Sequence, residues 1–456
     1  MNPRPLALAL LLPACSPPHQ SGPDQFDDDN LSYTYDKDLP LTGNRPAVDA
    51  AVDAWMATNH VAGCGVSLAE AGHVTFVQGY GLRDVAAGDP FDIDTMAPVG
   101  SISKTITALA TMRMVEDGLV DLDDEIGDFV LGEDPSWAGM TLRHGLSHTT
   151  GLPKWPTWTA GLRTEADFEA AYPGIERPTL FPWVVQTSWR TTPTQTTPGS
   201  AALYSNIGVE AVGAVIDYLS MTYVPDQAGY ERYAWNTVAL PTGDWFDPDD
   251  MLTPVSAAPW RMGDMPNRSL PYSWNGAGYD RVADEWDVWW PGGAGGASGA
   301  WMMTPGDLGR LTLAFRRDGR VIDPASHDTL TTWHSNAISG GYGLGVALGS
   351  QLGRTALWHT GLADGHQAMW LYWPTEDIGV GVVCNSDQGS IAGLATAVGA
   401  TALPLTGPPI EWDPGEVGPA AYGLTDADVA AWQADADATE AALSAAQAEQ
   451  VLSSAQ

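Results

Sequence analysis

The stretch Ser101-Ile102-Ser103-Lys104 decides how this chain is interpreted, because it places a hydroxyl group and an amine three positions apart. The apolar spacing that follows predicts a helix that ends near Gly118. Side chains three positions apart share one face of a helix, so the Lys104 amine can reach the Ser101 hydroxyl. A lysine whose pKa is lowered by burial can take the proton of a serine and make it a nucleophile. Lysine is also scarce, and the chain has it only at Lys37, Lys104 and Lys154.

A lone S-x-x-K motif arises by chance, and serine is a common helix cap. The catalytic interpretation of Ser101 and Lys104 therefore depends on two later motifs. Tyr204-Ser205-Asn206 precedes an apolar run, 207–219, that predicts a helix. The phenol can act as a general acid or base, and the amide can hold a substrate carbonyl. Leu357-Trp358-His359-Thr360-Gly361 predicts a strand that closes on a glycine, where a substrate backbone can approach.

With these motifs in this order, the chain resembles the serine β-lactamase and penicillin-binding-protein superfamily, specifically its class C-like branch. That branch also includes D-alanyl-D-alanine carboxypeptidases, D-aminopeptidases and β-lactamase-fold esterases. Residues 142–153 resemble the family segment LLxHTSGLP, and residues 299–308 resemble the segment GGLxSTxxDL. The resemblance covers roughly residues 46–405.

The resemblance implies an α+β fold of the β-lactamase/transpeptidase-like type. Such a fold has an antiparallel β-sheet flanked by helices and a mostly helical subdomain. On this pattern we expect a helix near residues 390–402 and strands near 61–68, 73–80, 342–349, 354–360, 366–373 and 378–385.

The resemblance also assigns catalytic roles to Ser101, Lys104 and Tyr204. Ser101 would attack a carbonyl and form an acyl-enzyme, while Lys104 and Tyr204 move the proton. The backbone N–H groups of Ser101 and Leu362 would form the oxyanion hole, which needs donors aimed at the developing charge. The residues that it assigns to substrate binding and the oxyanion hole are Asn206, His359, Thr360, Gly361 and Leu362. No cofactor is implied.

The chain departs from the family pattern at His359, where classical β-lactamases and carboxypeptidases carry lysine. A histidine is mostly neutral near pH 7, so it pairs poorly with a substrate carboxylate. We therefore predict weak or absent penicillin hydrolysis, and esters or small D-amino-acid amides and peptides as substrates. Two alternatives stay open: a penicillin-binding-type carboxypeptidase or β-lactamase, and a surface sensor that keeps the fold without turnover.

Two patterns suggest metal sites, and neither is favoured. His144 and His148 are four positions apart, but Gly145 stands where the zinc motif H-E-x-x-H needs glutamate. The acidic turn 121–125 is similar to the start of a calcium loop, yet Gly127 comes one position late. The sequence has no G-x-S-x-G elbow and no nucleotide-binding glycine motif, so we expect neither a metal nor a cofactor.

The N-terminus predicts export. Arg4, the apolar run 6–12 and then Pro13-Ala14-Cys15 resemble a bacterial lipoprotein signal peptide, with cleavage before Cys15 and lipidation of its thiol. The expected organisation is a signal peptide (1–15), a flexible acidic and Pro-rich spacer (16–45), the hydrolase domain (46–405) and an acidic, partly helical tail (406–456). The mature protein would be periplasmic or at the cell surface, anchored by lipid.

Cys64 and Cys384 each lie in a run that predicts a strand. In the family fold the first strand lies beside the last, antiparallel, and this pairing would bring the two cysteines close together. An exported location permits a disulfide, but buried free thiols are also common. The sequence leaves both possibilities open.

Charge limits the partners. The formal net charge is −36, with 56 acidic residues against 20 Lys and Arg. Such a chain does not bind nucleic acid electrostatically, and an anionic membrane surface repels it apart from a lipid anchor. We expect a small-molecule ester or peptide substrate as its partner, and the family makes a cell-wall origin one option.

Overall fold

The computed structural model describes residues 46–130, 135–154, 192–224, 229–239, 241, 267–282, 296–338, 341–363, 365–386 and 388–403. All of them belong to one compact unit, Asp38–Gln456. The expected signal peptide with Cys15, the spacer and the acidic tail lie outside the described residues. Within the described part of the chain, no helix is both long enough and apolar enough to cross a membrane.

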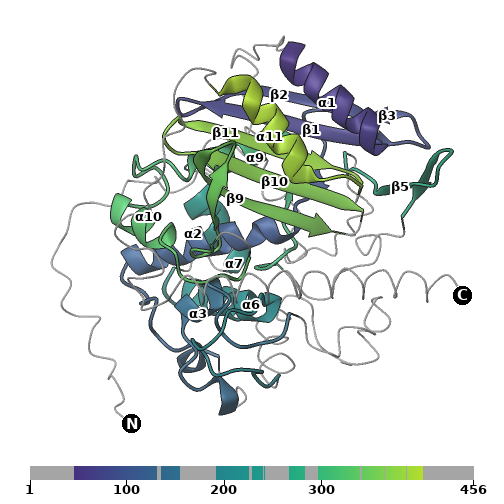
Figure 1. Cartoon of the computed structure of the whole chain (residues 1–456). Helices are drawn as coiled ribbons and strands as arrows, with labels where there is room; N and C mark the ends of the chain where they lie inside the picture. The colour runs from purple at the N-terminus through teal and green to yellow at the C-terminus, as the bar shows by residue number, and fades with distance from the viewer. Residues whose placement is uncertain are drawn as a thin grey trace, which may run out of the picture. The chain divides into compact units, whose positions relative to one another are not determined.

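A seven-stranded antiparallel sheet forms the frame, with strand order β3-β2-β1-β11-β10-β9-β8 (Figure 1). Its strands are β1 (Gly63–Glu70), β2 (His73–Asp84), β3 (Asp89–Pro90), β8 (Ala347–Gln351), β9 (Arg354–Ala363), β10 (His366–Trp373) and β11 (Ile378–Cys384). The strand expected at 342–349 begins later, at Ala347, because the preceding residues turn through Gly345 at a φ of 68°. Two short pairs lie beside the sheet: β4 (Ala97–Pro98) with β7 (Met302–Met303), and β5 (Tyr272–Trp274) with β6 (Tyr279–Arg281).

The two faces of the sheet are covered by different helices, because successive side chains of a strand point to opposite faces. In β10, Met369 and Leu371 pack in one cluster with residues of α1 (Pro46–Asn59) and α11 (Ile391–Ala402). Trp370 packs in the other cluster, together with residues of α9 (Pro305–Leu313). This arrangement confirms the predicted antiparallel sheet flanked by helices.

The helical part is built around α2 (Ser103–Glu116), which is buried along most of its length and contacts α6 (Asn206–Tyr223), α7 (Tyr230–Ala234) and α10 (Pro324–Leu330). The helices predicted after Ser101 and at 207–219 are therefore present as α2 and α6. The shorter elements are the 3₁₀ turns η2 (Gly100–Ile102), η3 (Ile126–Asp128) and η4 (Pro135–Trp137), the π-helical turn η9 (Trp235–Ala239) and α3 (Leu142–Leu146).

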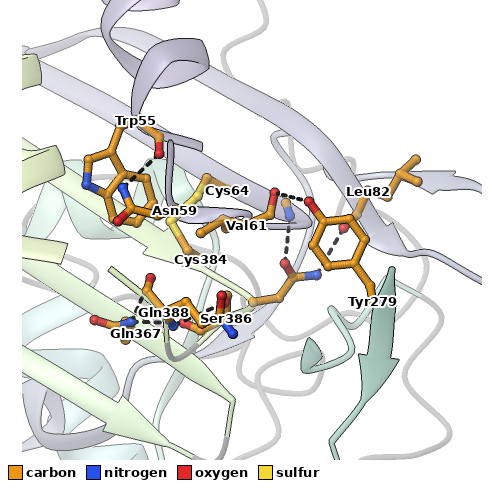
Figure 2. Close-up of a disulfide and its surroundings, with 12 residues drawn as sticks. Trp55, Asn59, Val61, Cys64, Leu82, Tyr279, Gln367, Cys384, Ser386 and Gln388 are labelled. Atoms are coloured by element: carbon orange, nitrogen blue, oxygen red, sulfur yellow. Dashed lines mark hydrogen bonds between the residues drawn. A yellow bond between two sulfur atoms is a disulfide. The ribbon is translucent and has the colours of Figure 1, made fainter. Parts of the chain in front are cut away.

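A disulfide between Cys64 and Cys384 joins two neighbouring strands of the sheet, β1, which comes first along the chain, and β11, which comes last (Figure 2). The two residues are register partners in β1 and β11, with a Cα–Cα distance of 4.1 Å, and both are fully buried. Beside the bond, the Asn385 side chain accepts a hydrogen bond from the N–H of Gly63 (2.7 Å) and donates one to the carbonyl of Leu82 (3.0 Å). The two ends of the described domain are thus held together covalently and by backbone contacts.

Removal of this bond is expected to destabilise the fold. A Cys64→Ala/Cys384→Ala variant should lose about 2–5 kcal/mol of unfolding free energy, because the bond closes a loop with a sequence separation of 320 residues in the unfolded chain. Urea unfolding of the wild type, with and without reductant, and of the variant measures the change. Alkylation of both thiols in denatured, unreduced wild type would contradict the bond.

Candidate active site

Ser101 lies in the 3₁₀ turn η2, one turn before the helix that carries Lys104. The turn packs directly against β9, and two glycines make the approach possible. A Cβ added to Gly100, whose φ is 53°, would meet the backbone N of Leu362 at 2.7 Å, and one added to Gly361 would meet the carbonyl oxygen of Val99 at 1.7 Å. In the direction of the missing Gly361 side chain, the close approach is made by the protein's own backbone.

The Lys104 amine is fully buried beside Ser101. Its Nζ lies 2.9 Å from Ser101 Oγ and donates a second hydrogen bond to the carbonyl of Ser298 at 2.6 Å. Burial holds the pKa of Lys104 well below its usual range, the Glu210 carboxylate partly opposes this shift, and the charge of Lys154 adds to it. A lysine in this state reaches its neutral form readily, and neutral Nζ can accept the Ser101 proton.

Tyr204 is the second group in contact with the Ser101 side chain. It forms a hydrogen bond with Ser101, and burial raises its pKa above the ordinary phenol value. Lys104 Nζ lies 4.9 Å from the centroid of the Tyr204 ring. The His148 ring also packs against Tyr204, with 4.1 Å between the two ring centroids. The structure therefore brings the three predicted catalytic residues together around one hydroxyl group.

Asn206 begins α6, where Ser205 caps the helix by accepting a hydrogen bond from the N–H of Gly208 at 3.1 Å. The backbone N–H of Asn206 donates to the carbonyl of Lys154 at 3.1 Å. Its side-chain oxygen Oδ1 is buried and has no hydrogen-bond partner among the described residues. Buried polar atoms are normally paired, so Oδ1 is an acceptor left open to a donor N–H or O–H group, whereas the substrate carbonyl expected here would need the amide N–H instead.

His359 is buried in β9 and is held by two contacts. Its Nε2 lies 2.9 Å from the hydroxyl oxygen of Tyr342, and its Nδ1 lies 2.6 Å from the carbonyl oxygen of Thr360. Burial lowers the pKa of His359 to about 3, the Lys104 charge adds to this shift, and the bond to Thr360 opposes it. The imidazole is therefore neutral near pH 7 and offers no positive charge to a substrate. Thr360 and Leu362, on the opposite side of the strand, are exposed.

The histidines considered as a zinc pair do not lie on one helix. Helix α3 ends at Leu146, and His148 has a φ of 59°. His144 Nδ1 accepts the N–H of Thr141 at 3.2 Å, and His148 Nδ1 accepts the N–H of Ser205 at 3.2 Å. The His144 ring thus caps α3, and the His148 ring holds the backbone next to Tyr204.

The acidic turn 121–125, which is similar to the start of a calcium loop, forms hydrogen bonds with neighbouring segments of the protein. Asp123 accepts two hydrogen bonds from Arg143, at 2.7 and 2.8 Å, and Glu125 accepts one from the N–H of Gly139 at 2.9 Å. In the part of the chain that the structure describes, no group of three or more His, Cys, Asp or Glu side chains is placed to hold a metal ion.

Three residues at the site were not identified from the sequence: Glu210, Ser298 and Tyr342. Glu210 had a weak signal, since it is a carboxylate inside the apolar run 207–219. Ser298 contributes backbone atoms to the site, and a backbone carbonyl has no sequence signal because every residue has one.

A model of the beta-lactamase family matches residues 48–403. The chain belongs to the β-lactamase family. Among curated relatives, it is 29% identical to penicillin-binding protein 4* of Bacillus subtilis over 93 residues and 31% identical to esterase EstB of Burkholderia gladioli over 119 residues. These matches span 20% and 25% of this chain, and only 20% and 30% of the length of those relatives.

Solved structures agree on the fold. A penicillin-binding protein homologue from Pyrococcus abyssi has a TM-score of 0.62 and 21% identity, covering 83% of this chain and 80% of its own. D-amino acid amidase from Ochrobactrum anthropi SV3 also has a TM-score of 0.62 and 21% identity, covering 80% of this chain and 99% of its own. The predicted family and fold class are thus confirmed, and β-lactamase family membership is consistent with a serine hydrolase.

His359 is expected to stay neutral throughout the range in which ordinary histidines titrate, because burial lowers its pKa to about 3. Long-range ¹H–¹⁵N NMR spectra recorded from pH 5 to pH 8 would then show constant neutral-imidazole shifts for this ring. A His359→Gln variant identifies the signal by deleting it. A titration midpoint near 6 would show that the ring is hydrated and able to carry charge.

Proposed function

We propose that the protein is an exported serine hydrolase that forms an acyl-enzyme at Ser101 with neutral esters or small amides and peptides, including those of D-amino acids. The observation that carries the proposal is the position of Lys104 Nζ, buried and 2.9 Å from Ser101 Oγ. A serine hydroxyl needs a partner that removes its proton, and a buried amine with a lowered pKa meets this need.

The reaction follows from these contacts. Ser101 Oγ attacks the carbonyl carbon while its proton passes to neutral Lys104 Nζ, and the carbonyl oxygen takes up negative charge beside the N–H groups of Ser101 and Leu362. The bond to the leaving group then breaks, and the alcohol or amine leaves with a proton returned from Lys104 through Tyr204. Water attacks the Ser101 ester by the same proton route, which releases the acid and restores the hydroxyl.

The preference for neutral substrates rests on His359, which stands at the family's lysine position and is buried and uncharged. Esterase EstB and the D-amino acid amidase are named for ester and amide substrates, which supports these classes for this chain. A carboxypeptidase or β-lactamase acting on carboxylate-bearing substrates is the second candidate, favoured by the similarity to penicillin-binding protein 4*. A sensor that acylates without turnover is the third.

Ser101→Ala tests the nucleophile. Wild-type protein treated with a fluorophosphonate should gain the mass of one adduct on Ser101 and should hydrolyse p-nitrophenyl acetate and butyrate. The variant should gain no adduct, and its turnover should fall by at least about a thousandfold, because no other group replaces an acylated serine. The measurements are intact mass and release of p-nitrophenol. If the wild-type protein gains no fluorophosphonate adduct, Ser101 is not the nucleophile.

The same preparation distinguishes the candidates. Turnover of neutral esters and D-amino-acid amides together with slow nitrocefin or penicillin hydrolysis supports the proposed substrates. Efficient nitrocefin turnover favours the β-lactamase candidate instead. A Ser101 adduct without turnover of any member of the panel favours the sensor.

Export is supported by the signal-like sequence that ends at Cys15 and by the disulfide, which persists in oxidising compartments. Expression of the full chain in a bacterial host with labelled palmitate should give a labelled, membrane-bound product. The Cys15→Ser variant should lose the label because it lacks the acceptor thiol. Equal labelling of both proteins, or of neither, would contradict lipidation at Cys15.

A further inference from the structure

Glu210 is a buried carboxylate that the proposed mechanism does not use. It lies in the second turn of α6 and is fully buried. Its Oε1 accepts a hydrogen bond from the backbone N–H of Ser298 at 2.7 Å, and the carbonyl of the same residue accepts the bond from Lys104 Nζ at 2.6 Å. One residue's backbone thus connects the carboxylate to the amine.

This connection is held from both helices that border it. From α2, Thr107 Oγ1 donates to the carbonyl of Ala297 at 2.6 Å, and Lys104 binds Ser298. From α6, Glu210 holds the N–H of Ser298. The backbone is therefore fixed at three adjacent polar atoms, the carbonyl oxygen of Ala297 and the nitrogen and carbonyl oxygen of Ser298. The Ser298 carbonyl, which orients Lys104, consequently has little freedom to move.

Charge couples the same two side chains. The groups that face Lys104 are Glu210, the Lys154 amine, the His148 and His359 imidazoles and the Tyr204 ring. Among these described groups, Glu210 is the acid, and it raises the pKa of Lys104 against the effect of burial. Burial in turn raises the pKa of Glu210 to about 7, while its bonds to Ser298 and the Lys104 charge oppose this shift.

We propose that Glu210 is a positioning residue that orients Lys104 through the backbone of Ser298 and stabilises the ammonium formed when Lys104 accepts the Ser101 proton. This inference rests on the proposed function, since it concerns the same proton transfer. The transfer converts a neutral amine into a buried cation, which is costly without an opposite charge nearby. Above about pH 7, where Glu210 is mostly ionised, its carboxylate supplies that charge before the reaction begins, so no group has to reorganise.

Asp217 provides a matched control on the same helix. It is also a buried carboxylate that accepts a backbone hydrogen bond, in this case from the N–H of Tyr230 at 2.9 Å, and burial raises its pKa to about 6. Its bond is to α7, and although the Tyr230 hydroxyl contacts Thr107 Oγ1 at 2.7 Å, the acid whose charge acts on Lys104 is Glu210 and not Asp217. A purely structural effect of neutralising a buried acid on α6 should therefore appear in Asp217→Asn as well.

The test compares Glu210→Gln with Asp217→Asn in the full chain. Two rates are measured between pH 5 and pH 10: fluorophosphonate modification of Ser101, and kcat/KM for p-nitrophenyl butyrate. Gln keeps an oxygen for the Ser298 N–H but lacks the charge. The inflection that reports Lys104 should move to lower pH by about one to three units, because an opposite charge no longer raises the pKa of the amine. The plateau rate should fall about tenfold or more, since each pKa unit corresponds to a factor of ten in the stability of the ammonium.

Glu210→Asp serves as the rescue variant, because it keeps the charge on a shorter side chain. Its inflection should lie close to the wild-type position, although its plateau falls. If Glu210→Gln does not fold by circular dichroism, Glu210→Asp decides the matter, and an unchanged plateau in that variant overturns the positioning role.

The outcomes separate the two proposals. A wild type whose Ser101 is not modified overturns the proposed function, and the role of Glu210 with it. Ser101 modification with a Glu210→Gln profile that superimposes on the wild type overturns the role of Glu210 alone. An equal pH shift in Asp217→Asn also overturns it. A shift confined to Glu210→Gln supports it.

Discussion

The burial of the Lys104 amine beside Ser101 is the constraint on which the site depends. An ammonium removed from water is strongly disfavoured, so the folded protein shifts this group toward its neutral form. The loss of water around Lys104 raises the free energy of the folded protein, and it also lowers the pKa of the amine so that it can act as a base. The helix that carries it packs against α6, α7 and α10, and the fully buried amine is held against the serine and the Ser298 carbonyl.

The sheet holds the other side of the site. β9 lies between β8 and β10 and approaches η2 so closely that only glycines fit at positions 100 and 361. β10 is paired to β11, which is joined to β1 by a ladder and by the Cys64–Cys384 bond. The position of the strand next to Ser101 therefore depends on pairings that begin at the first strand of the domain. A packed sheet transmits such constraints because its interior has little free volume.

Two electrostatic features, one at the site and one of the whole chain, bear on the charge of the substrate. The neutral His359 ring, paired with the Tyr342 hydroxyl, removes the fixed cation that a carboxylate would need. The formal net charge of −36 also disfavours the approach of anionic molecules at low ionic strength. Both features support the proposed preference for a substrate without a negative charge.

The sequence by itself determined the pair Ser101 and Lys104, the order of the motifs, and the helices α2 and α6, because these depend on local spacing and on hydrophobic periodicity. It also indicated most strands of the sheet, and the resemblance supplied their antiparallel pairing. Only the tertiary structure decided the contacts of Lys104 with Ser298, of Glu210 with Ser298 and of His359 with Tyr342. The first two contacts join residues 194 and 88 positions apart. The burial that sets the charge of these groups is likewise a property of the packed molecule, since no local pattern reports how much water surrounds a side chain.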